Sequence, residues 1–139
     1  MGNAATVQAI EDNLTAILIA QGFKVEDLST DPDADVTPLV VILFEGETFE
    51  ETSGQRGSYN TVRFTLAVRF SDKATASARD RSVTYAQLIR KNVTVNNLNV
   101  NTLADSKLVK LVIHTGYQRE YATPIVSVDY PIEVTYRET

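Results

Sequence analysis

The segment that decides the fold is Ile125–Tyr136, which reads IVSVDYPIEVTY. Apolar and polar residues alternate through it without a break, which is the period of a strand with one buried face. The apolar set is Val126, Val128, Tyr130, Ile132, Val134 and Tyr136, and the polar set is Ser127, Asp129, Pro131, Glu133 and Thr135. Because proline cannot donate a ladder hydrogen bond, Pro131 predicts that this strand lies at a sheet edge or is bulged there.

Three further stretches have strand character. Thr61–Phe70 alternates in the same way, with one apolar side formed by Val62, Phe64, Leu66, Val68 and Phe70. Leu39–Phe44 is a short apolar run rich in β-branched residues, which predicts a central strand buried on both faces. Leu108–His114 has strand composition, and Thr115–Thr123 is either a polar connection or an extended hairpin arm.

Two segments have the period of amphipathic helices. Ala4–Gln21 follows a possible N-cap at Asn3, precedes a natural stop at Gly22, and gathers on one face Val7, Ile10, Leu14, Ile17 and Leu18. Ala76–Asn92 predicts the second helix from the spacing of Tyr85, Leu88, Ile89 and, beyond them, Val93. Its basic residues are expected on the exposed sides: Arg79, Arg81, Arg90 and Lys91.

Other segments are rich in polar residues and predict connections. Phe23–Leu28 is expected to be a short strand or an extended exit from the first helix, and Ser29–Pro38 an exposed acidic loop. The stretch from Glu45 to Tyr59 contains three glycines and four glutamates, so we expect a long flexible loop at 45–59 that is mobile or ordered by a partner. The Asn-rich segment Val93–Ser106 is expected to be a loop with a short strand.

This order of elements predicts an α+β fold for a single domain spanning residues 1–139. The sheet is expected to be mostly antiparallel, with both helices packed on one face, because each well-patterned strand is apolar on one side only. The other face would carry Arg63, Arg69, Asp129 and Glu133, and would serve either as solvent surface or as a subunit interface.

The net charge of −5 hides a division along the chain. Residues 1–55 contain eleven acids and one base, Lys24, which sums to −10, whereas residues 56–139 contain seven acids and twelve bases, which sums to +5. Such a chain can dock one face of a copy onto a different face of the next. A solvated acidic face is the plainer alternative. The acidic total argues against a general nucleic-acid binder.

We expect no catalytic, cofactor-binding or metal site. The absence of Cys excludes disulfide scaffolds, thiolate nucleophiles and Cys-built metal sites. His114 is the only histidine, and no nucleophile motif accompanies it. Asp31, Asp33 and Asp35 imitate the start of a calcium loop, but Val36 and Ile42 stand where that loop needs Gly and Glu.

Two weaker patterns also lead to no assigned site. Gly54–Gly57 lacks the third glycine and the flanking elements of a phosphate-binding loop. Tyrosines gather late in the chain near Arg119 and Arg137 and could stack on single-stranded nucleic acid, but the alternation assigns two of them to the apolar face. These tyrosines are Tyr117, Tyr121, Tyr130 and Tyr136.

Neither an export signal nor a membrane span is expected. The apolar stretch Ala16–Ala20 is far shorter than the roughly 20 residues of a spanning helix. Glu11 and Asp12 precede it where a signal peptide has basic residues. The sequence therefore predicts a soluble intracellular chain.

The order of the elements resembles the tail terminator (minor tail, tail completion) proteins of long-tailed bacteriophages. The resemblance spans essentially the whole chain: a helix ending at Gly22, the Leu39–Phe44 strand with its polar loop, the Thr61–Phe70 strand leading into the Ala76–Asn92 helix, and the closing Ile125–Tyr136 strand. It implies an α+β subunit of a hexameric ring that caps the tail tube, ends tail polymerisation and presents its other face to the head–tail connector. It places the protein in the virion tail, and in the host cytoplasm during assembly.

This function needs no enzyme activity, and its partners would be copies of the chain, the tail-tube protein and the connector, without a membrane or a specific nucleic acid. The candidate interaction residues are Glu47, Phe49, Glu50, Glu51, Arg56, Arg63, Arg69, Arg79 and Arg81. Alternatives are a head–tail connector or stopper, a tail-tube subunit, or, in a different class, a small ligand-binding domain or enzyme that uses His114 or the Asp31–Asp35 loop.

Overall fold

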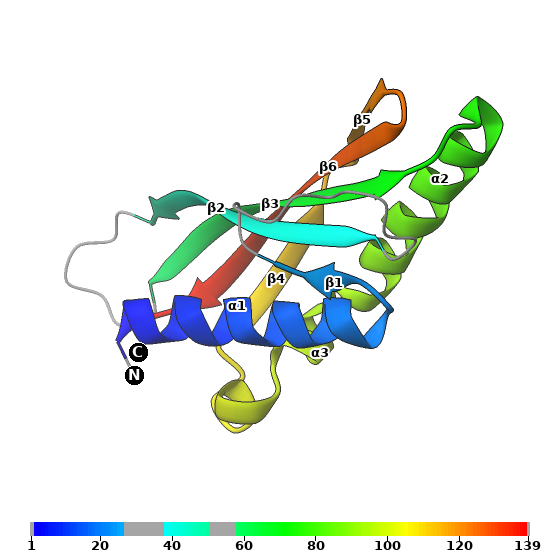
Figure 1. Ribbon diagram of the computed structural model, residues 1–139. Coiled ribbons are helices and arrows are strands. Elements are labelled where there is room, and N and C mark those ends of the chain that lie inside the picture. Colours follow the sequence, from blue (N-terminus) through cyan, green and yellow to red (C-terminus); the bar gives the residue numbers. More distant parts are fainter. Residues whose placement is uncertain (1, 27–37, 51–57, 139) are drawn as a thin grey trace.

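The structure is a computed structural model that describes residues 2–26, 38–50 and 58–138. Its elements are α1 (Asn3–Ala20), β1 (Lys24–Val25), β2 (Leu39–Phe49), β3 (Tyr59–Ser71), α2 (Thr75–Asn92), α3 (Val95–Leu98), a 3-10 turn η1 (Asn101–Leu103), β4 (Val109–His114), β5 (Gln118–Ala122) and β6 (Ile125–Arg137). The sheet order is β1-β2-β3-β6-β4, and β5 pairs with β6 beyond the end of β4. Only β1 and β2 run parallel. The predicted α+β class and the mostly antiparallel sheet are confirmed (Figure 1).

The centre of the sheet is the pair of long strands β3 and β6. They pair without a register shift from Tyr59 opposite Arg137 to Ser71 opposite Ile125. β6 as a whole is not an edge strand, because it has neighbours on both sides, and it is not bulged against β3 at Pro131. On the side away from β3, however, the partner changes between Asp129 and Ile132 from β5 to β4, and Pro131 lies in that interruption.

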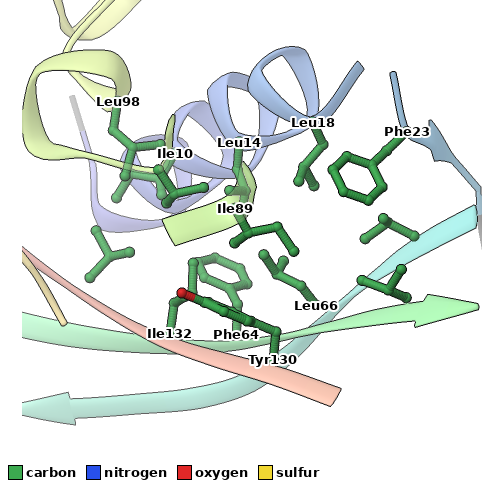
Figure 2. Packing of buried hydrophobic residues seen from close by; sticks show 14 of the residues in the cluster. Ile10, Leu14, Leu18, Phe23, Phe64, Leu66, Ile89, Leu98, Tyr130 and Ile132 are labelled. Atoms are coloured by element: carbon green, nitrogen blue, oxygen red, sulfur yellow. The ribbon is translucent and has the colours of Figure 1, made fainter. Parts of the chain in front are cut away.

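The helices pack on one face of the sheet, as predicted. From α1, Ile10, Leu14 and Leu18 point toward the apolar side of the central strands, and Ile89 of α2 lies beside them (Figure 2). Burying such side chains contributes roughly 1.5–3 kcal/mol each. Gly22 follows α1 with φ +93°, a left-handed conformation that favours glycine and confirms the predicted helix stop.

Several predicted boundaries are corrected by the structure. Asn3 is the first residue of α1 and not its N-cap, which is Gly2. Residues 45–49 of the expected loop belong to a strand, because β2 continues to Phe49 past a bulge between Phe44 and Gly46, and Tyr59 is already part of β3. Of β2, only Leu39–Val41 is buried on both faces, because Phe44 is exposed.

Two predicted loops fall partly or wholly outside the described residues. Most of the acidic segment Ser29–Pro38 lies there, with Asp31, Asp33 and Asp35. The remainder of the 45–59 segment, residues 51–57, lies there too, and includes Glu51, Arg56 and Gly54–Gly57.

The Asn-rich segment contains the short helix α3 and the turn η1 between irregular residues, so the predicted short strand is wrong. Thr94 caps α3 by accepting the N–H of Asn97 at 3.2 Å, and η1 follows. Asn13 of α1 joins this segment to the core by donating to the carbonyls of Leu98 at 2.9 Å and Val100 at 3.1 Å. The asparagines therefore bind backbone groups where a regular ladder is absent.

Thr115–Thr123 contains β5, which confirms the hairpin-arm alternative. The arm of β5 and β6 projects from the end of the sheet, while the two chain ends lie close together at the opposite end (Figure 1). In the part of the chain that is described, no helix is long and apolar enough to cross a membrane.

Candidate interaction surfaces

The described candidate interaction residues lie in three places. Glu47, Phe49 and Glu50 are at the end of β2, on what we call the β2–β3 arm, formed by Gly46–Glu50 and Ser58–Asn60. Arg63 and Arg69 lie on the open face of the sheet, opposite the helices. Arg79 and Arg81 belong to α2. Glu51 and Arg56 lie outside the described residues.

The β2–β3 arm carries exposed aromatic rings beside acidic groups. Phe49 is 61% exposed and Phe44, just before the bulge, is 54% exposed. Glu50 holds the arm together: its N–H donates to the carbonyl of Tyr59 at 3.1 Å, and its carboxylate accepts the N–H of Tyr59 at 3.1 Å. Two exposed Phe rings near one strand end are a feature of contact surfaces.

Glu47 has a structural partner as well as its place on the arm. The buried hydroxyl of Tyr136 donates to Glu47 Oε2 at 2.8 Å, and Asn60 Nδ2 donates to the same hydroxyl at 3.4 Å. Burial raises the pKa of Tyr136 to about 12, so the phenol stays neutral and can donate. Glu47 therefore fixes the end of the sheet.

The same cluster joins the two ends of the chain. Asn3 and Asn60 both donate to Glu138 Oε1, Asn60 at 3.0 Å. These hydrogen bonds hold the pKa of Glu138 below its usual value, and the one from Asn3 has the larger effect. The arm is thereby tied to the start of α1.

The open face mixes charges with apolar side chains. Arg63 lies between Gly46 and Glu133 in the register and donates to Thr48 Oγ1 at 2.6 Å. At the β4 side, Leu111 and Ile113 are exposed opposite Thr135 and Glu133. Neither residue was among the predicted interaction residues, although both alternate with Val112 along the strand.

A groove of about 510 Å³ crosses this face. Leu43, Thr65 and Pro131 form one row across three strands, which is the floor of the groove. Its remaining lining residues are Glu45, Thr115, Gly116, Tyr117, Gln118 and Asp129. Glu45 and Asp129 are the charged residues among those that line the groove.

Arg81 is partly buried, which corrects the prediction that it lies on an exposed side of α2. Its guanidinium donates to the carbonyl of Ser71 at 2.9 Å and to the hydroxyl of Tyr85 at 2.9 Å, and lies 4.4 Å from the centroid of Phe70. It also pairs with Asp72 at 3.4 Å. Hydrogen bonds from Ser77 and Ala74, and then the Arg81 charge, hold the pKa of Asp72 below its usual value.

We expect Arg81→Met to lower the free energy of unfolding by about 2 kcal/mol, because it removes charge-assisted hydrogen bonds and a cation–π contact. Arg79→Met is the matched control, since Arg79 is exposed and pairs only with its neighbour Asp80 in the described contacts. It should change stability by less than about 0.5 kcal/mol. Equal losses in urea unfolding would contradict the anchoring role of Arg81.

His114 has a structural environment. Its Nε2 lies 2.8 Å from the carbonyl of Val93, which can only accept, so Nε2 carries the hydrogen. In the neutral ring Nδ1 then accepts from the hydroxyl of Tyr130 at 2.6 Å. The ring thus joins the end of α2 to β4 and β6.

We expect His114→Ala to cost about 2 kcal/mol of stability, because it leaves the Val93 carbonyl and the buried Tyr130 hydroxyl without their partner. Lys110→Ala on the same strand, exposed to solvent, is the control and should cost less than about 0.5 kcal/mol. Chemical denaturation followed by circular dichroism measures both. An unchanged midpoint for His114→Ala would rule out this role.

Within the described part of the chain, the remaining chemistry-bearing patterns form no assembled metal or base-stacking site. Among residues 2–26, 38–50 and 58–138, no group of three His, Asp or Glu is placed to hold a metal ion. Tyr130 and Tyr136 are buried, and Tyr121 donates its hydroxyl to the carbonyl of Asp72 at 3.0 Å. These three rings are therefore packed within the protein and are not a stacking platform for bases.

Comparison with known proteins gives a structural likeness alone. No protein-family model matches the chain, and no curated protein sequence matches it. Among solved structures, a chain from the virion of a native gene transfer agent (GTA) particle is similar, with a TM-score of 0.53 and 12% sequence identity. The similarity covers 94% of this chain and 92% of that chain, so the two share a fold over nearly their whole length.

Proposed function

We propose that the chain is a structural protein of a phage-like virion. The observation that carries this proposal is the fold shared with a chain of the GTA virion over 94% of the present sequence. In this proposal the chain is not an enzyme and works beside other virion proteins.

Within the virion, we propose the role of tail terminator: copies form a ring, hexameric in the resembling family, on the end of the tail tube. The ring stops polymerisation there and offers its other face to the head–tail connector. A ring requires each copy to present two different, complementary surfaces. The acidic N-terminal part and the basic C-terminal part of this chain supply such a pair.

The test is assembly of tail tubes from the tail-tube protein of the same particle, with and without this chain. Electron microscopy should show shorter tubes that carry a ring at one end. Unchanged tube lengths with bare ends would overturn the terminator role. A chain that polymerises alone into long tubes would be a tube subunit, and one that binds only the connector would be a stopper.

We expect salt to weaken association of the copies, because the proposed contact opposes unlike charges that are exposed to solvent. Raising NaCl from about 0.05 M to about 0.5 M shortens the screening length severalfold and should weaken the association constant about tenfold. Sedimentation velocity at a fixed protein concentration measures this. An association constant independent of salt would contradict charge matching.

A further inference from the structure

The outer edge of β2 is an unoccupied strand edge in the described structure. β1 pairs only with Leu39 and Val40, so from Val41 to Phe49 no described strand lies on that side. The backbone of Glu50 faces β3, since its N–H donates to Tyr59. Because backbone groups in an antiparallel ladder alternate, those of Phe49 and Glu47 face outward. Such an edge can accept another strand.

The charge of this edge is of one sign. Residues 39–50 contain Glu45, Glu47 and Glu50 and no Lys or Arg. Pairing β2 with β2 of a second copy would bring these carboxylates together, which disfavours a symmetric contact. The edge therefore suits a basic strand.

The opposite edge of the same sheet has the complementary charge. Residues 107–119, which include β4, contain Lys107, Lys110, His114 and Arg119 and no acid. Lys107, Lys110 and Arg119 are all exposed. Both edges also carry exposed apolar side chains, Phe44 and Phe49 on β2, and Leu111 and Ile113 on β4.

At the start of β4, the outward backbone groups of Val109 already have a hydrogen-bond partner. The side chain of Asn99 pairs with Val109 in both directions, donating to its carbonyl at 2.8 Å and accepting its N–H at 3.0 Å. Past Val109, the described residues place no strand outside β4. A partner strand would thus begin its pairing after Val109.

We propose that the outer edge of β2 in one copy adds to the outer edge of β4 in the next copy, so that the sheet continues from subunit to subunit. This inference rests on the proposed function, because it assumes that copies of the chain associate, and it specifies the contact between them. Because β2 and β4 lie on opposite sides of the central pair β3 and β6, the contact is heterologous and can repeat around a ring. The open faces of all copies then join into one surface.

Charge exchange between variants tests the proposal. The chain Glu45→Lys carries a basic group at each of the two edges, and the chain Lys110→Glu carries an acidic group at each of them. Each alone should associate at least about tenfold more weakly than the natural chain at low salt. A mixture of the two should regain association, with alternating subunits. Failure of the mixture to associate more tightly than either variant alone would overturn the proposal.

Cross-linking provides a second test that does not depend on charge, because the natural chain has no Cys. A short thiol cross-linker should join a Thr48→Cys chain to an Ile113→Cys chain in a mixture, and should join neither variant to itself. Ala76→Cys, on the exposed start of α2, is the control and should not link to Thr48→Cys. Links within the Thr48→Cys variant alone would instead show a symmetric β2 contact and overturn the proposal.

The two experiments separate this proposal from the function on which it rests. Rings that cap tubes but give no Thr48–Ile113 link and no rescue by mixing would leave the terminator role standing and refute the strand pairing. Specific links and rescue without any effect on tail tubes would support the pairing and refute the terminator role.

Discussion

Phe64→Ala is expected to lower the free energy of unfolding by about 3–5 kcal/mol, the cost of removing a buried Phe ring and leaving a cavity. Phe64 is 1% exposed, lies on the core side of β3 opposite Ile132, and packs edge-to-face on Phe44 with ring centroids 6.1 Å apart. The total stability of a domain is typically about 5–15 kcal/mol, so this loss is a large fraction of it. Urea unfolding followed by circular dichroism or tyrosine fluorescence measures it.

The control for Phe64 is its neighbour on the other face. Thr65→Ala changes a half-buried side chain on the open face and should cost less than about 1 kcal/mol. A loss below about 1.5 kcal/mol for Phe64→Ala, or an equal loss for both variants, would show that the core is not on the helix side of β3.

Asn13→Ala is expected to cost about 2–4 kcal/mol, because Asn13 makes three contacts from a buried position. It donates to the carbonyls of Leu98 and Val100 and accepts from Asn101 Nδ2 at 3.0 Å. Its removal leaves these groups without their partner, and each one that stays buried lowers the free energy of unfolding by roughly 1–3 kcal/mol. The substitution should also speed amide hydrogen exchange in α3 and η1 relative to the natural chain, and should speed it more there than in the central strands.

The control for Asn13 is Gln8→Ala on the same helix, whose exposed amide donates to Asp12 at 2.9 Å. That change should cost less than about 0.5 kcal/mol. Ala is the better helix former, so a loss at Asn13 would not arise from helix propensity. Unchanged stability and exchange in Asn13→Ala would contradict the role of this side chain in joining α1 to the Asn-rich segment.

The parts of the fold that could be predicted are the helices and strands in which burial of one face produces a periodic pattern of apolar residues. β3 and β6 alternate along most of their length because one face contacts the helices, and α1 shows the helical period for the same reason. The end of β2 could not be predicted, since Glu45–Phe49 lies at an edge where burial imposes no pattern. The Asn-rich segment is held by side-chain hydrogen bonds to backbone, which produce no hydrophobic period.

The candidate surfaces were predictable only in part. Exposed Phe49 and the arginines of the open face follow from composition and alternation. Arg81 is held by contacts with Ser71, Asp72 and Tyr85. These contacts depend on the folded arrangement and cannot be predicted from sequence spacing. The free edge of β2 requires the strand order, which places the acidic segment and the basic segment on opposite sides of the central pair β3 and β6.

In the proposed ring, copies of this chain contact one another through two different surfaces. Native mass spectrometry of the chain mixed with tail-tube protein tests this most directly, because some ring-forming proteins assemble only on their target. We predict one dominant closed oligomer, a hexamer if the family resemblance holds, that binds tube ends and dissociates at high salt. A chain that stays monomeric in the presence of tubes and never binds them would contradict the account.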